Sequence, residues 1–290
     1  MEIPDGEKQG KGRAIQNLMQ LPQDDKIRAI IDVKNLQDEE FVNSHYIVLC
    51  TKQGIIKKTD LADFSRPRAN GVNAITIVEG DQLLNAKMTD GNSEIMLAVK
   101  SGRAIRFPEA KVRSTGRGAI GVSGIEVDDA TDEVVGMICV NVEDKSRTVL
   151  VVSEKGYGKR TAVDEYRVTN RGGKGVKTIS VTEKTGKLVG ILDVTEKEDL
   201  MITCVSGITI RTSIAQISEQ GRATQGVKLI RLDDEDEIAA ITNLDVVIEQ
   251  PEAEGIENIV AEASTDAPAT NESTPESPEN NQGPEEKTEN

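Results

Sequence analysis

The chain contains 290 residues, of which 37% are hydrophobic but only 2% aromatic, and its formal net charge is −15. A core without tryptophan must be built from Val, Ile, Leu, Ala and Met, and this palette favours sheets over helical bundles. Residues 245–290 hold 13 acidic residues and one basic residue, so residues 1–244 carry only −3. The acidic total therefore does not exclude a nucleic-acid partner for the body of the chain.

Other features of the sequence argue against a membrane protein and against a redox or disulfide-bonded protein. No apolar run approaches the roughly 20 residues of a membrane span, and the polar opening of the chain does not resemble a signal peptide. Cys50, Cys139 and Cys204 are far apart without a CxxC pair, which is typical of reduced core thiols. We therefore expect a cytoplasmic protein with no membrane partner.

A repeat of about fifty residues organises the chain. Its first element is a turn glycine followed by a short apolar strand, seen in a divergent early copy at residues 12–15. The later copies begin at Gly71, Gly121, Gly175 and Gly226, which are 50, 54 and 51 residues apart. An acidic turn and a second apolar strand follow each of these glycines.

The last element of the repeat is a hairpin. An apolar strand leads to a turn at Gly54, Gly102, Gly156 or Gly207, and the returning strand carries basic residues. About four short strands at a period near fifty are typical of a β-propeller blade, whereas a β-sandwich would not need the same three elements in the same order. The marks of WD and kelch repeats are missing.

We predict an all-β fold: a propeller-like ring, closed or incomplete, of about five four-stranded blades, with a disordered acidic C-terminal tail. There are five turn-and-strand elements but only four hairpins. The chain is therefore expected to start inside a longer natural domain or to form an open, incomplete ring. We predict one folded domain over residues 1–246. Residues 247–290, rich in Pro, Glu, Asn, Ser and Thr, are expected to be disordered.

Several motifs resemble catalytic or ligand sites. Residues 116–121 spell G-x-G-x-x-G, but a strand-like segment follows instead of a helix, so a β-turn explains these glycines better than a dinucleotide site. The acidic run 233–237 lacks the spacing of a calcium loop and favours a solvated turn. His45 is the only histidine, and no nucleophile-elbow or P-loop pattern occurs. We expect no catalytic residue, no metal and no cofactor in this chain.

Basic residues recur in register at two places in the repeat, around the glycine-rich turn and on the returning strand of the hairpin. In a ring, equivalent positions line one edge, so these charges predict a curved cationic belt for duplex phosphates, without base readout or aromatic stacking. The candidate DNA-binding residues are Lys11, Arg13, Lys57, Lys58, Arg66, Arg68, Arg103, Arg106, Arg113, Arg117, Lys159, Arg160, Arg171, Gly172, Gly173, Lys174, Arg211 and Arg222.

The segment Thr169-Asn170-Arg171-Gly172-Gly173-Lys174-Gly175 resembles a degenerate copy of the gyrase A box, Gln-Arg-Arg-Gly-Gly-Lys-Gly. Similar motifs occur in the same order over residues 9–245, including 12–18, 92–107, 156–163 and 221–227. The chain thus resembles the C-terminal domain of bacterial DNA gyrase A subunits, in an alignment that starts from the second blade. Thr169 and Asn170 replace the Gln and first Arg of the full box, which belongs to the first blade.

The resemblance implies a β-pinwheel, a propeller variant with strands exchanged between blades, that wraps duplex DNA around a basic rim. It implies as partners double-stranded DNA, the gyrase B subunit, and the N-terminal part of the gyrase A subunit, with ATP and Mg²⁺ bound elsewhere in the enzyme. A nucleoid location follows. The alternatives are a propeller that acts only as a protein-interaction scaffold and the C-terminal domain of a topoisomerase IV A subunit.

Overall fold

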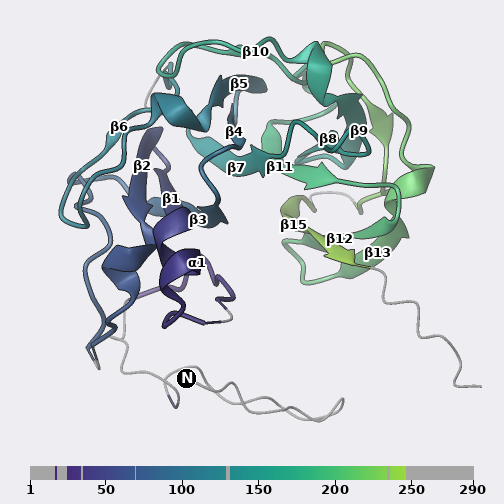
Figure 1. Cartoon of the computed structure of the whole chain (residues 1–290). Helices are drawn as coiled ribbons and strands as arrows, with labels where there is room; N and C mark the ends of the chain where they lie inside the picture. The colour runs from purple at the N-terminus through teal and green to yellow at the C-terminus, as the bar shows by residue number, and fades with distance from the viewer. Residues whose placement is uncertain are drawn as a thin grey trace, which may run out of the picture. The chain divides into compact units, whose positions relative to one another are not determined.

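The computed structural model describes residues 17, 25–33, 35–68, 70–128, 131–233 and 236–245, all within the first of two units, Met1–Val247. The predicted all-β class is confirmed (Figure 1). Within these residues the one α-helix is α1 (Glu39–Ser44), capped by the Asp38 side chain, which accepts a hydrogen bond from the Phe41 amide. Lys11, Arg13, the early repeat copy at 12–15 and residues 247–290 lie outside the described residues.

The strands form four antiparallel sheets. The first sheet has the order β3 (Leu83–Thr89), β1 (Tyr46–Thr51), β2 (Ile55–Asp60), β6 (Val122–Ser123). The second has the order β7 (Val134–Val140), β4 (Glu94–Val99), β5 (Arg103–Pro108), β10 (Val176–Lys177). The third has the order β11 (Leu188–Val194), β8 (Thr148–Ser153), β9 (Tyr157–Ala162), β14 (Val227–Lys228), and the fourth β15 (Ile238–Asp245), β12 (Glu198–Cys204), β13 (Thr209–Ser213).

Strands are exchanged between sheets. The hairpin β1–β2 and the inner strand β3 are consecutive in the chain, but the outer strand β6 returns from beyond the next hairpin to pair with β2. β10 and β14 return in the same way to β5 and β9. Each outer strand thus links a sheet to the repeat that follows, and β3, β7, β11 and β15 lie on the inner side (Figure 1).

One prediction about the repeat is corrected, and another is tested only in part. The described residues form four blades, and the early copy, which counts toward the predicted five, lies outside them. The turn at Gly71 leads into no strand over residues 71–78. The three later copies become strands by pairing with the hairpin one repeat before the hairpin that they directly follow. In the described part of the chain only the β1–β2 hairpin precedes Gly71, so the hairpin that this copy would need is not among the described residues. A short segment without a partner strand has no ladder to join.

Both faces of the hairpin strands are buried, which explains their continuous apolar sequence. In β1, Val48 and Cys50 pack with the second sheet, whereas Ile47 and Leu49 pack with helix α1 and the loop that follows β2. Further cores lie between the second and third sheets and between the third and fourth. The hydrophobic core is therefore divided into layers between successive sheets.

The acidic turns of the repeat hold the hairpin turns in place. Asp81 Oδ1 accepts a hydrogen bond from the Gln53 amide (3.0 Å), Asp132 Oδ1 from the Ser101 amide (2.9 Å) and Asp236 Oδ1 from the Ser206 amide (3.1 Å). Hydrogen bonds from Ser206 lower the pKa of Asp236. The described part of the 233–237 run thus acts as a turn, in agreement with the sequence-based interpretation.

Short 3₁₀ helices follow the hairpins. They are η2 (Leu61–Phe64), η3 (Glu109–Lys111), η4 (Val163–Glu165) and η5 (Ile214–Gln216). No helix in the described residues is long and apolar enough to cross a membrane.

Candidate nucleic-acid interface

The glycine-rich turns of successive repeats contact one another and form a continuous surface, here named the loop band and defined as residues 71–76, 113–128, 167–181 and 218–230. The Thr76 amide donates to the Ala119 carbonyl, the Gly172 amide to the Gly124 carbonyl, and the Ser180 amide to the Thr224 carbonyl. Since β6, β10 and β14 are part of it, the band runs along the outer edges of the sheets.

The loop band carries eight basic side chains in its described residues. All eight are exposed or half-buried: Arg113, Arg117, Arg167, Arg171, Lys174, Lys177, Arg222 and Lys228. Two of the arginines repeat a single geometry: Arg171 donates to the Ser123 carbonyl (3.0 Å), and Arg222 donates to the Lys177 carbonyl (3.1 Å). Each of these two arginines therefore spans from its own loop to the preceding exchanged strand.

The segment that resembles the gyrase A box lies at the centre of this band. The Gly172 amide donates to the Gly124 carbonyl, and the Gly173 carbonyl accepts from the Glu126 amide. Lys174 Nζ lies 3.0 Å from Asp128 Oδ1 and 3.6 Å from Glu126 Oε1. These two acidic groups raise the pKa of Lys174, the Asp128 hydrogen bond having the larger effect.

Arg103 and Arg211 belong to the hairpins and reach different neighbours. Arg103 is half-buried at the start of β5 and donates to the Lys174 and Gly175 carbonyls, so it supports the box-like segment. Arg211 is exposed and paired with Asp199 at 2.6 Å. Arg66 and Arg68 are exposed in the loop before Gly71, just outside the band.

The remaining hairpin residues of the predicted belt are buried rather than exposed. Lys57, Lys58, Arg106, Lys159 and Arg160 are each at most 7% exposed. Their side chains bond to protein groups and are not presented to phosphates in this conformation. The charges that recur at the hairpin in sequence therefore have a structural role here, because the exchanged strand and its loop cover them.

Lys58, Arg106 and Arg160 hold the 3₁₀ helix of the neighbouring sheet. Lys58 Nζ pairs with Glu109 of η3, and Arg106 donates to the carbonyls of Val163 (2.7 Å) and Tyr166 (3.0 Å) at η4. Arg160 donates to the Ile217 carbonyl after η5 (2.7 Å). An arginine at this register position thus donates to carbonyl groups within or just after a 3₁₀ helix, where few backbone donors are available.

Sequence reasoning missed Lys177 and Lys228 as candidate site residues. Both are exposed, and each stands two residues after a turn glycine on an exchanged strand, β10 or β14. The signal that could have found them is the shared pattern Gly-Val-Lys at 175–177 and 226–228.

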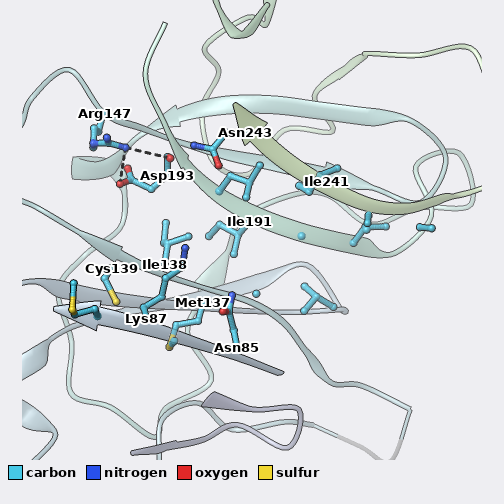
Figure 2. A pocket seen from close by; sticks show the side chains of 18 residues that line it. Asn85, Lys87, Met137, Ile138, Cys139, Arg147, Ile191, Asp193, Ile241 and Asn243 are labelled. Atoms are coloured by element: carbon cyan, nitrogen blue, oxygen red, sulfur yellow. Dashed lines mark hydrogen bonds and ion pairs between the residues drawn. The ribbon is translucent and has the colours of Figure 1, made fainter. Parts of the chain in front are cut away.

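The inner strands enclose a separate cavity of about 460 Å³. Figure 2 shows Asn85 and Lys87 of β3 facing Ile191 and Asn243 across it, with the Arg147–Asp193 pair at one end. Burial raises the pKa of Asp193 to about 6, against the effect of Arg147, whose guanidinium lies 3.1 Å from the carboxylate. No group of three metal-ligating side chains occurs in the described residues.

Four repeated sheets, three of which receive an exchanged outer strand in the described residues, with a basic loop band along the exchanged edge, define a β-pinwheel, a variant of the β-propeller. The family described as the DNA gyrase C-terminal domain, β-propeller, matches residues 45–90, 93–141, 147–195 and 198–245. The chain belongs to this family, and each of the four matched segments contains the hairpin and the inner strand of one sheet.

Individual relatives agree with this assignment. The DNA gyrase A subunit of Staphylococcus aureus strain NCTC 8325 is 40% identical over 267 residues, covering 91% of this chain and 29% of that protein. The chain thus spans less than a third of the length of this relative. A solved gyrase A C-terminal domain matches with a TM-score of 0.69 and 27% identity over 80% of this chain and 75% of that one.

A topoisomerase IV C-terminal domain also superposes, with a TM-score of 0.73 and 19% identity over 81% of this chain and 71% of that chain. At this identity the likeness shows the shared fold alone. The family match, together with the 40% identity to a gyrase relative, favours gyrase over topoisomerase IV.

Proposed function

We propose that the chain binds duplex DNA through the loop band, without reading base sequence, and bends the duplex as the C-terminal part of a gyrase A subunit. The observation that carries this proposal is the continuity of the band: loops from successive repeats touch, and Arg171 and Arg222 stand at the same register in two of them. Charges spaced along a curved edge match a duplex backbone, whose affinity comes mainly from phosphate contacts.

Energetics allow bending on such a surface. Bending a 20–30 bp site by 40–90° costs on the order of 1–6 kcal/mol, and several phosphate contacts on a preformed edge can offset it. The band offers no aromatic platforms for single-stranded bases, since its basic residues are interleaved with Gly, Ser and Thr. Duplex DNA is therefore the expected substrate.

The test is duplex affinity measured against salt concentration, with one charge reversal in the band and one matched reversal outside it. Lys174→Glu should lower affinity about tenfold at low salt and reduce the salt slope. Lys87→Glu, at an exposed lysine on the inner strand β3, changes the same charge and should have a much smaller effect. Equal effects would mean that the band is not the interface, and no binding at low salt would refute DNA binding itself.

The wider role is part of the same proposal. As a segment of gyrase A, the chain would work in the cytoplasm, on nucleoid DNA, together with gyrase B, which would hold the ATP and Mg²⁺, and with the N-terminal part of its own subunit. Relaxing closed circular DNA with the protein bound measures the linking-number change that wrapping produces. Binding without such a change would leave a DNA-binding module that does not wrap.

The protein-interaction scaffold remains the competing class. It predicts that the parent chain does not bind duplex DNA and that charge reversal at Arg171 and Lys174 leaves its complexes with partner proteins intact. The geometry favours DNA binding over this class, because the loop band carries eight basic side chains along a continuous edge.

A further inference from the structure

Two buried lysines lie beneath the loop band. Lys159 is fully buried, and its Nζ donates to the Gly221 carbonyl (2.6 Å), the Thr224 carbonyl (3.2 Å) and the Thr224 hydroxyl (3.1 Å). These acceptors flank Arg222 in the last loop of the band.

Lys57, at the same register position of the first sheet, repeats the arrangement. Its Nζ donates to the Ala74 carbonyl (2.6 Å), the Arg117 carbonyl (3.0 Å) and the Thr59 hydroxyl (2.9 Å). An ammonium group has three hydrogens to donate, so in both sites every donor is satisfied, and most of the acceptors are loop carbonyls.

The second sheet lacks this device. Ile105 of β5 occupies the equivalent position and is packed in the core. Its loop, the box-like segment, is held instead by Arg103 and by its own Arg171, which donates to the Lys111 carbonyl. Two loops of the band are therefore held by a buried lysine and one is not. The loop of the second sheet thus serves as a comparison within the same chain for the effect of the buried lysine.

Burial of an ammonium group has a measurable cost. Desolvation, together with the smaller effects of Arg222 and Lys177 and against the opposing effect of Glu165, lowers the pKa of Lys159 to about 8. Burial also lowers the pKa of Lys57. An uncharged side chain at this site would be buried at a lower cost in free energy than an ammonium group. The presence of lysine therefore points to a role beyond packing.

We propose that Lys159, and by the same geometry Lys57, are positioning residues for DNA binding: they hold the loop backbone that aims Arg222 and Arg117 at phosphates. This inference rests on the proposed DNA-binding function. Neither lysine touches DNA in this assignment; each acts through the loop above it. Loss of the ammonium group would remove one hydrogen bond from each of these loop carbonyls and so loosen the loop.

DNA binding should in consequence depend on pH. Phosphates added above the loop favour the protonated form of Lys159, so the pKa is higher in the complex than in the free protein. Between the two values DNA binding must take up protons, and affinity falls as pH rises through about 8. Below that range the lysine is charged in both states, and affinity does not depend on its titration.

The experiment compares Lys159→Met with Ile105→Met, a substitution at the same register position in a sheet without the buried cation. Lys159→Met should weaken duplex binding about threefold to tenfold at pH 7, whereas Ile105→Met conserves volume and should leave it unchanged. In an Arg222→Gln background, Lys159→Met should have little further effect on affinity, since it acts through that loop. Additive losses in the double variant would overturn the positioning role.

A second measurement uses the unmodified chain, so it does not depend on a variant that folds. Calorimetric titration of duplex DNA in two buffers of different ionisation enthalpy, at a pH about half a unit above the pKa of about 8, should show proton uptake. Uptake should be absent well below that pKa and reduced in Lys159→Met. Normal DNA binding without uptake at the higher pH would overturn this inference alone, and absence of duplex binding at low salt would refute the proposed function.

Discussion

Lys58 and Glu109 form a buried ion pair between neighbouring repeats: Nζ lies 3.1 Å from Oε1, and the two side chains are 9% and 0% exposed. Lys58 lies near the end of the hairpin of the first sheet, and Glu109 begins η3 after the hairpin of the second. The Thr89 hydroxyl donates to the same carboxylate oxygen (2.7 Å), while Lys58 also lies over the Tyr46 ring. A charge pair in this position ties adjacent sheets together.

Removing one partner of this pair should be strongly destabilising. Lys58→Met leaves the Glu109 carboxylate buried without a counter-charge, and we expect a loss of about 3–5 kcal/mol in the free energy of unfolding. Lys58→Met combined with Glu109→Leu removes both charges and should recover most of that loss. Urea denaturation of the parent and both variants measures the difference, and a double variant no more stable than Lys58→Met would contradict this account.

Close approach of the exchanged strand should make one hairpin glycine more sensitive than another. Gly54 has φ +83°, and a Cβ there would lie 2.6 Å from the Ile125 carbonyl oxygen of the segment after β6. Gly207 has φ +89° but no atom within 4 Å of such a Cβ, because the described part of the fourth sheet has no exchanged strand.

Gly207→Ala should therefore cost only the backbone strain, about 1–2 kcal/mol. Gly54→Ala should cost that strain plus about 1–3 kcal/mol of overpacking. Thermal unfolding of both variants, each compared with the parent, isolates the contribution of the strand contact. Equal losses at the two positions would show that the contact contributes nothing.

The Asp193 carboxylate should make stability depend on pH in a defined window. Burial raises its pKa from the ordinary 3.8 to about 6, so the folded state binds a proton more tightly than the unfolded state. The stabilising effect is complete below about pH 4 and is lost as pH rises through about 6. At neutral pH the charged form is unfavourable, and its Oδ1 atom has no hydrogen-bond partner.

Asp193→Asn, which resembles the protonated acid, should raise the free energy of unfolding at about pH 7.5 by on the order of 2 kcal/mol. The gain should shrink towards zero at about pH 4, where the aspartate is itself protonated. Denaturation curves of both proteins at the two pH values provide the check. A variant that is destabilised at the higher pH would mean that the Arg147 pair outweighs the cost of burial.

Acidic neighbours of the box-like segment should limit its affinity for DNA. Lys174 is paired with Asp128 and Glu126, and a phosphate must compete with both. Asp128→Asn should raise duplex affinity about twofold to fivefold at low salt, with the gain fading at high salt because the pair is exposed. Asp199→Asn, which frees Arg211 outside the band, serves as the control and should change affinity less.

The sequence by itself determined the strand content, the period and the positions of the turns. Glycine at 121, 175 and 226 and continuous apolar runs rich in β-branched residues are local signals, since turn geometry and strand propensity depend on neighbouring residues. Basic residues of the glycine-rich turns were also predicted, because such a turn lies at the surface, whereas Lys177 and Lys228 on the exchanged strands were missed. Lys174 and Arg171 are examples of the predicted residues, and both belong to the loop band.

Only the tertiary structure decided which strands pair and which charges remain exposed. β6 carries no local mark that it belongs with β2 rather than with its neighbours in sequence, since a two-residue ladder is specified by packing of distant segments. For the same reason Lys57 and Lys159 read as surface cations in a hairpin. They become buried because an exchanged strand and its loop close over them and accept their hydrogen bonds. The accepting carbonyls of Arg117 and Gly221 lie 60 and 62 residues further along the chain than Lys57 and Lys159.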